Sequence, residues 1–231
     1  MITKINTIKC KNFFIFDIVN KVRKTMQKHL EILEILKKLY PNPRTALNFS
    51  NPLELLIATI LSAQCKDDTV NQVTKTLFAQ LKTPEEYLKI PNEQLEQMIY
   101  KTGFYKQKAK SIKKCCQYII ENFNGEVPAD FDKLTQLPGV GRKTASVVAG
   151  NAFGIPSIAV DTHVKRLSNL LGLANSQDPE KIEFQLKELY PESEWINLSH
   201  YLIYHGRNIC IARKPKCNIC QINHICPSKK L

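Results

Sequence analysis

The chain has 231 residues, of which 43% are hydrophobic, and it carries a formal net charge of +12 at pH 7. This length can bury one large or two modest cores, and the longest notable apolar run, Leu55 to Leu61, is far shorter than the roughly 18 residues of a membrane span. Residues 101–114 and 207–231 each hold six Lys or Arg residues and no acid, without the continuous apolar face of a membrane-surface helix. The composition therefore excludes a membrane protein and indicates a soluble protein that binds a phosphate backbone.

Residues 1–25 differ in composition from the rest of the chain. They hold six Lys or Arg residues and a single acid, Asp17, which interrupts the short apolar run at Phe13 to Phe16. No small-residue cleavage site follows, so the segment is not a secretory signal. We expect residues 1–25 to be a disordered extension outside the folded protein, with Met26 as a candidate start and organelle targeting as the alternative.

Apolar residues recur at helical spacing from Leu30 onward. The first stripe ends before Pro41, and Asn51-Pro52 then provides the N-cap and first turn of a strongly apolar helix. Helix-start patterns recur further along the chain, at Thr83-Pro84-Glu85-Glu86, Asn92, Asp130 and Asp178-Pro179. No strand-like alternation separates these segments, so we expect an all-α fold of about ten helices.

Two turns between the helices carry side chains that stand out. Ser62 to Asp67 is a polar tip on an apolar helix and includes Gln64, for which a solvated interhelical turn is the simplest interpretation. Thr102 to Lys106 places Phe104 at a glycine turn beside several lysines. An exposed Phe104 suits a wedge inserted between bases, with a cap on the hydrophobic core as the alternative.

The segment from Leu137 to Lys143 reads Leu-Pro-Gly-Val-Gly-Arg-Lys and joins two helical stripes. Pro138 cannot continue the first helix, while Gly139 and Gly141 allow positive φ and leave backbone N–H groups uncovered at the start of the second. Exposed amides and the positive end of a helix dipole both favour an anion, so this turn can hold a phosphate. A helix-helix corner without a ligand is the alternative.

The two residues that follow the turn, Arg142 and Lys143, favour the phosphate site. Cations are disfavoured at a helix N-terminus, and a structural purpose for both is hard to find. Further along, Asp161 ends a short apolar run and precedes another helical stripe, where it can act as an N-cap and also hold a carboxylate near the amine of Lys143. An amine and a carboxylate beside a phosphate-binding turn suggest nucleophilic chemistry on a nucleic-acid backbone or sugar.

Four cysteines close the chain, at Cys210, Cys217, Cys220 and Cys226. Thiols clustered so densely in a basic chain without a secretory signal predict a metal site in a reducing compartment. Zinc and a [4Fe–4S] cluster both accept four thiolates, and the spacing alone does not decide between them.

The stretch from Leu137 to Asp161 resembles the helix-hairpin-helix, the Gly/Pro-rich loop and the Asp of the DNA glycosylase superfamily, and Lys143 resembles the lysine of its endonuclease III-like branch. The resemblance extends from about Leu30 to Cys226. It implies a six-helix domain at 45–155 that contains the helix-hairpin-helix at about 131–153. It also implies a helical iron-sulfur domain formed by 26–44 and 156–231, with the active-site cleft between the two domains.

The resemblance also implies the chemistry. The expected activity is base-excision repair: a bifunctional glycosylase that removes oxidised pyrimidines and an AP lyase that cleaves 3′ to the abasic site through a Schiff base. Lys143 is the implied nucleophile, Asp161 its acid-base partner, and Cys210, Cys217, Cys220 and Cys226 the implied ligands of a [4Fe–4S] cluster. The implied DNA contacts come from Gln64, Phe104, Leu137, Pro138, Gly139, Val140, Gly141, Arg142 and His163.

We therefore expect a monomer that acts on damaged double-stranded DNA in the bacterial cytoplasm, associated with the nucleoid. Three rivals have different signatures. An adenine-removing monofunctional relative carries no lysine at the hairpin position, a non-catalytic DNA-binding module does not need Asp161 at this spacing, and a structural zinc protein would not be brown.

Overall fold

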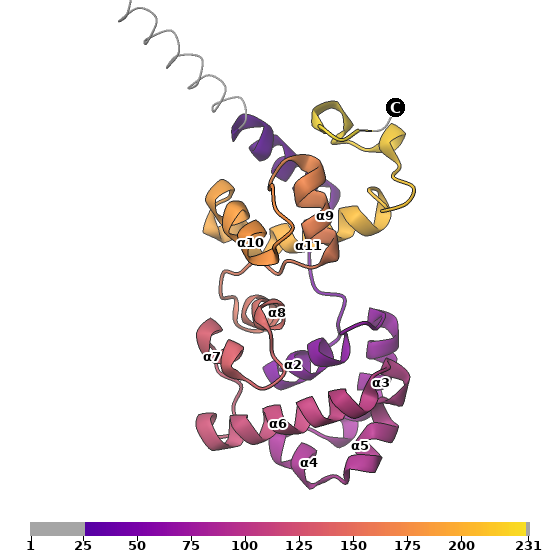
Figure 1. Cartoon of the computed structure of the whole chain (residues 1–231), viewed down its shortest axis with the longest axis vertical. Helices are drawn as coiled ribbons and strands as arrows, with labels where there is room; N and C mark the ends of the chain where they lie inside the picture. Colours follow the sequence, from indigo (N-terminus) through magenta and orange to yellow (C-terminus); the bar gives the residue numbers. More distant parts are fainter. Residues whose placement is uncertain (1–25, 230–231) are drawn as a thin grey trace, which may run out of the picture. The chain divides into compact units, whose positions relative to one another are not determined.

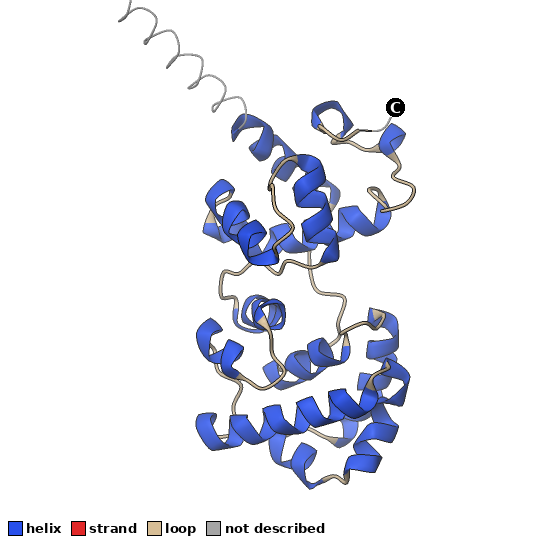
Figure 2. Cartoon of the chain, in the orientation of Figure 1, coloured by secondary structure: helices blue, strands red, loops and turns tan. Residues whose placement is uncertain are grey.

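The computed structural model describes residues 26–229, and the expectation for residues 1–25 falls outside that range (Figure 1). Within it every regular element is an α-helix or a short 3₁₀ helix, so the expected all-α fold is confirmed (Figure 2). None of the helices between residues 26 and 229 combines the length and the apolar character that crossing a membrane requires.

Contacts between residues divide the chain into two compact units. The first, called the hairpin unit below, comprises residues 43–161 and 192–200. The second, called the cysteine unit, comprises the described residues up to Asn42 together with 162–191 and those from Tyr201 onward. The hairpin segment and Asp161 thus share one unit, and the four C-terminal cysteines lie in the other.

The hairpin unit contains seven of the labelled α-helices and two 3₁₀ helices. They are α2 (Pro52–Leu61), α3 (Asp67–Gln80), α4 (Pro84–Lys89), α5 (Asn92–Ile99), η1 (Tyr100–Thr102), α6 (Tyr105–Phe123), α7 (Phe131–Gln136), α8 (Arg142–Phe153) and η2 (Glu192–Glu194).

The cysteine unit contains a helix over residues 26–39 and the elements α9 (Thr162–Leu171), α10 (Pro179–Leu189), η3 (Cys217–Ile219) and η4 (Asn223–Ile225). The remaining helix, α11 (Trp195–Asn208), contributes residues to both units.

Helices begin where the capping residues predict. Asn51 Oδ1 accepts from the Glu54 amide at 2.9 Å, and Pro52 opens α2. Thr83 and Glu86 exchange the two hydrogen bonds of a capping box at α4. Asp130 and Asp178 accept from the Lys133 and Glu180 amides at 2.8 and 2.9 Å. These local bonds fix the starts of α2, α4, α7 and α10, whereas α3, α5, α6 and α8 have no side-chain cap.

The core of the hairpin unit is built around α2, which is buried along almost its whole length and packs against α3, α6 and α8. The long helix α6 lies across α4 and α5 (Figure 1). Its buried face includes Ala109, Ile112, Cys116 and Ile119, as the helical spacing predicts. Because α2 and α8 are packed together, the hairpin before α8 is attached to the buried core of this unit.

Candidate active site and cysteine centre

The turn before α8 has the geometry of a type II β-turn. The Val140 amide donates to the Leu137 carbonyl at 3.0 Å, Pro138 occupies the second position, and Gly139 has a φ of 80°. A Cβ on Gly139 would also lie 3.0 Å from Ser111 Cβ on α6, so this position requires glycine for two reasons. Leu137 and Val140 are buried, and the hairpin therefore exposes backbone rather than these two side chains.

Gly141 does not use the positive φ that a glycine allows. Its φ of −84° and ψ of 171° are extended. The reason is its position as the N-cap of α8, where an extended backbone is the rule. Gly141 has no side chain with which to cap the first-turn amides, and a Cβ there would meet nothing within 4 Å. The N-terminus of α8 therefore faces open space with its positive dipole end exposed.

Arg142 and Lys143 are both exposed, but they differ in their contacts. The Arg142 guanidinium lies over the Phe131 ring, with Cζ 5.1 Å from the ring centre, so Arg142 has the structural purpose that the sequence did not reveal. The Lys143 side chain makes no hydrogen bond or ion pair with any residue between 26 and 229. Of these two cations, Lys143 is therefore the one whose position at the helix N-terminus no contact within residues 26–229 explains.

Asp161 is partly buried and directly precedes the first residue of α9. The loop that leads to it is fixed by serine hydroxyls that sequence reasoning missed. Ser157 Oγ donates to the Ser146 carbonyl on α8 at 2.8 Å, and Ser199 Oγ accepts from the Ala159 amide at 3.0 Å. Ser146 lies one helical turn from Lys143, so the loop carrying Asp161 is tied to the helix that carries the amine. No sequence pattern distinguishes these serines from ordinary surface hydroxyls.

The side chains of Gln64 and Phe104 are exposed, and both residues have left-handed backbones, with φ of 54° and 47°. Among described non-glycine residues only Asn124 shares this conformation, and asparagine tolerates it best. Phe104 is 68% exposed, which rules out the alternative of a core cap. Backbone strain at residues with exposed side chains is common at functional sites.

His163 lies in the cysteine unit on α9. A Cβ on Gly206 would approach its Nδ1 to 2.9 Å, so the imidazole packs closely against α11. Of the predicted DNA contacts, His163 therefore lies in the cysteine unit, and all the others lie in the hairpin unit.

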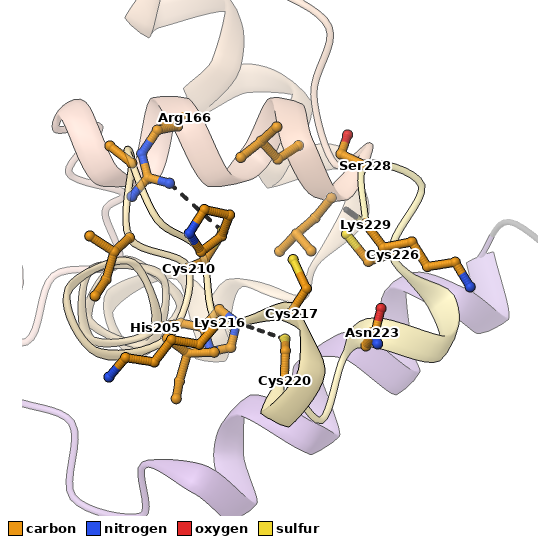
Figure 3. Close-up of a pocket in the computed structure, with 16 residues that line it drawn as sticks. Arg166, His205, Cys210, Lys216, Cys217, Cys220, Asn223, Cys226, Ser228 and Lys229 are labelled. Atoms are coloured by element: carbon orange, nitrogen blue, oxygen red, sulfur yellow. Dashed lines mark hydrogen bonds between the residues drawn. The ribbon is translucent and has the colours of Figure 1, made fainter. Parts of the chain in front are cut away.

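Cys210, Cys217, Cys220 and Cys226 line one cavity of about 230 Å³ in the cysteine unit (Figure 3). Arg166 on α9 donates to Cys210 Sγ at 3.7 Å and to the Gly206 carbonyl at 3.3 Å. His205 on α11 lies between two partners, with Nε2 3.5 Å from Cys220 Sγ and Nδ1 3.3 Å from the Tyr40 hydroxyl. The sequence did not identify Arg166, His205 or Tyr40, because they are distant from the cysteines along the chain.

The lining of this cavity has the donor set of a metal group bound by four thiolates. Within residues 26–229 no three His, Cys, Asp or Glu side chains gather closely enough to hold one metal ion. The four thiols instead surround the cavity with apolar neighbours such as Leu170 and Ile209. Burial raises the pKa of the Cys210 and Cys220 thiols, and at Cys210 the Arg166 side chain opposes this effect. A bound metal group keeps such thiols ionised.

Comparison with known families gives two matches. Residues 57–192 match the HhH-GPD superfamily base excision DNA repair proteins. Residues 210–226 match the iron-sulfur binding domain of endonuclease III. The two matched segments contain the hairpin, Lys143, Asp161 and the four cysteines.

Individual relatives agree with these matches over nearly their full length. The chain is 48% identical to endonuclease III of Synechocystis over 91% of this chain and 97% of that protein, and 46% identical to that of Escherichia coli K12 over 88% and 96%. It superposes with a TM-score of 0.85 on a trapped endonuclease III–DNA covalent intermediate, at 46% identity over 88% of this chain and 96% of the other. A thermostable thymine-DNA glycosylase, at 24% identity and a TM-score of 0.80, shares the fold.

Proposed function

This chain belongs to the endonuclease III family of base-excision DNA repair proteins, and from that premise we propose that Lys143 is its nucleophile and Asp161 its acid-base partner. As a member of that family it is a DNA glycosylase and AP lyase that carries a [4Fe–4S] cluster. The proposal concerns the residues that perform each part of this activity.

The observation that carries the proposal is the contrast at the start of α8. Lys143 is an exposed amine without a partner among residues 26–229, at a helix end that disfavours cations, and it follows a turn whose amides are open to an anion. A DNA phosphate at the exposed amides of the hairpin from Leu137 to Arg142 would neutralise that end of the helix. The same phosphate would hold the neighbouring nucleotide in reach of Lys143.

In the proposed reaction the damaged nucleotide is flipped out of the duplex, because its sugar carbon cannot be attacked inside the stack. The neutral amine of Lys143 forms a bond to C1′ as the glycosidic bond breaks, and the base leaves with that electron pair and takes up a proton. Ring opening gives a Schiff base between Lys143 and C1′. Loss of a C2′ proton then expels the 3′ phosphate, and water hydrolyses the Schiff base to free the amine.

We assign Asp161 two tasks in this sequence. Its carboxylate stabilises the positive charge that develops on the sugar as the base departs, and it carries protons between intermediates. Its placement supports this assignment, because the bond between Ser157 and Ser146 ties its loop to α8.

We assign Gln64 and Phe104 to the duplex itself. Both side chains are exposed at strained turns in the unit that carries Lys143. Gln64 would fill the space left by the flipped nucleotide, and Phe104 would wedge between bases of the other strand. The remaining contacts come from the hairpin and from His163, and the partner is damaged double-stranded DNA bound by one copy of the chain.

We assign Cys210, Cys217, Cys220 and Cys226 as the ligands of the [4Fe–4S] cluster. Once bound, the cluster supplies four metal–thiolate bonds that hold residues 210–226 in place of a hydrophobic core. Arg166 and His205 would donate to the sulfurs of Cys210 and Cys220, and Tyr40 would orient His205. We assign the cysteine centre no part in the reaction itself. The loop that it holds carries Arg213, Lys214 and Lys216 at its edge.

Borohydride trapping on a duplex with one oxidised pyrimidine tests the nucleophile. The native chain should give a covalent protein–DNA adduct, because borohydride reduces the Schiff base to a stable amine. Lys143→Gln should bind the damaged duplex and give no adduct. An adduct of unchanged yield from Lys143→Gln would refute the assignment.

A further inference from the structure

The most unusual charged residue outside the proposed chemistry is Lys108 on α6. It belongs to residues 101–114, whose six lysines indicate a phosphate-binding surface, yet it is only 5% exposed. A buried ammonium is costly unless it is fully hydrogen-bonded. Its surroundings therefore indicate a specific task inside the hairpin unit.

The Lys108 ammonium bridges two main-chain carbonyls from separate elements. Nζ donates to the Leu61 carbonyl at 2.7 Å and to the Thr102 carbonyl at 2.8 Å. These carbonyls are those of the last residues of α2 and η1, where helices leave such groups unsatisfied and where the dipole favours a cation. One side chain thus caps the C-terminal ends of two helices at once.

The two elements that Lys108 joins lead directly into the turns that carry the proposed duplex-inserting side chains. Gln64 follows Leu61 by three residues, and Phe104 follows Thr102 by two. The Lys108 amide also donates to the Phe104 carbonyl at 3.0 Å, so main chain and side chain act on the same turn. Gln64 and Phe104 both have left-handed backbones, which cost free energy in a non-glycine residue and persist only where the surrounding structure holds them.

From this geometry we propose that Lys108 is a positioning residue that clamps the Gln64 and Phe104 turns at a fixed separation, so that both side chains enter the duplex together. The inference rests on the proposed duplex roles of Gln64 and Phe104. Lys108 touches neither substrate nor reacting atoms. Burial lowers the pKa of its ammonium, which the thiol of Cys65 partly opposes, and the two carbonyls are the groups that keep a charged donor favourable there.

The chain supplies a matched control on the same helix. Lys113 Nζ also donates to two main-chain carbonyls, those of Leu88 and Ile90, at 3.4 and 2.5 Å. Its partners lie at the end of α4 and belong to neither of the two inserting turns. Lys108→Met and Lys113→Met therefore remove the same kind of interaction from one helix, and only the first should affect insertion.

Insertion is measured with 2-aminopurine placed opposite an abasic site in a duplex. The proteins carry Lys143→Gln, so that no chemistry follows, and they are added at saturating concentration. The native turns should unstack the probe and raise its fluorescence. Lys108→Met should lose most of this increase, while Lys113→Met should retain it.

A second measurement separates positioning from general loss of structure. With Lys143 intact, Lys108→Met should reduce trapping on duplex substrate about 10- to 100-fold, as expected for a misplaced catalytic geometry. Trapping on a single-stranded abasic oligonucleotide should stay near the native rate, because no base pair has to be opened. A native fluorescence increase in Lys108→Met, or an equal fall on both substrates, would overturn the clamp.

Two further variants keep the outcome decisive. If Lys108→Met does not fold, Lys108→Gln replaces it. The glutamine amide can reach at most one of the two carbonyls, so this variant should show an intermediate loss of fluorescence. The double variant Gln64→Ala/Phe104→Ala should abolish the signal. If the double variant kept the full fluorescence increase while Lys143 still gave the trapped adduct, the proposed insertion roles would be wrong, and the clamp would be wrong with them. If the double variant lost the fluorescence increase and the Lys108 variants kept it, only the clamp would be refuted.

Discussion

The guanidinium of Arg142 lies over the Phe131 ring, 5.1 Å from its centre, and so connects the first residue of α8 to the first residue of α7 across the hairpin. This contact separates the roles of two adjacent cations. Arg142 holds the two helices of the hairpin together, and Lys143 is left as the amine available to a substrate.

We predict that Arg142→Ala keeps the borohydride adduct and loses stability. Removal of an exposed cation–π contact should lower the free energy of unfolding by about 0.5–1 kcal/mol, and loss of the charge should weaken duplex binding in a salt-dependent way. Chemical denaturation and trapping on the same preparation test both parts. An Arg142→Ala protein that lost the adduct while it still bound duplex would show that the two cations act as a unit.

For Asp161 we predict that Asp161→Asn binds damaged duplex with near-native affinity but releases the base about 10²- to 10⁴-fold more slowly, the range expected for loss of a general acid-base group. Asparagine also caps helices well, so the start of α9 should be preserved. Base release measured in single turnover, beside a thermal melt, tests the assignment. Near-native release would reduce Asp161 to a helix cap.

Gln64→Gly should separate stability from function. Glycine adopts a φ of 54° without the steric penalty that glutamine has there, so the free energy of unfolding of the variant should be higher than that of the native chain by about 1 kcal/mol. It should also lose activity on duplex substrate, because no side chain remains to fill the gap left by the flipped base. Asn124→Gly is the matched control, since it also places glycine at a left-handed position, at the end of α6, and should leave activity unchanged. A Gln64→Gly protein of native activity would remove Gln64 from the proposed site.

The features that the sequence predicted are those with local causes. Caps such as Asn51, Thr83 and Asp130 act within one helical turn, so their hydrogen bonds could be read from neighbouring residues. The turn at Gly139 was predictable for the same reason, because Pro followed by Gly defines it without reference to the rest of the chain.

What the sequence could not predict depends on residues far apart along the chain. The bond of Lys108 to Leu61 spans 47 residues, and the bond of His205 to Tyr40 spans 165. Lys108 was counted with surface lysines because its charge is visible in the sequence and its burial is not. Glycine permits a positive φ at Gly139 and Gly141 alike, whereas only the fold determines that Gly139 uses it and Gly141 does not.

Metal analysis should find iron and sulfide, and no stoichiometric zinc, in protein prepared without oxygen. Cys217→Ala should lose the brown colour, become less soluble and bind duplex more weakly before base release is affected, because the cluster stabilises residues 210–226 rather than the reaction. Cys65→Ala, a thiol of the hairpin unit, is the control and should keep its iron. One zinc per chain without iron would contradict the ligand assignment.

The last prediction concerns acid stability and His200 on α11. Its imidazole is buried, and Nε2 lies 2.9 Å from Oδ1 of Asn151 on α8, so the neutral ring donates to that amide oxygen. Burial lowers the pKa of His200 to about 4, against about 6.5 in an unfolded chain.

Between pH 6.5 and 4 the His200 imidazole is therefore protonated in the unfolded chain and neutral in the folded protein. The contribution of His200 to stability is complete above about pH 6.5 and declines as the pH falls, by roughly 3 kcal/mol at pH 4. His200→Gln places an amide N–H near the position of Nε2 and cannot titrate, so its free energy of unfolding should fall less steeply over this range. Burial also lowers the pKa of His205 to about 4, so part of the slope should remain in the variant. Urea denaturation of both proteins at several pH values provides the comparison. The cluster absorbance is recorded in parallel to detect iron loss. Identical dependence of the free energy of unfolding on pH in the two proteins would show that His200 is not the group responsible.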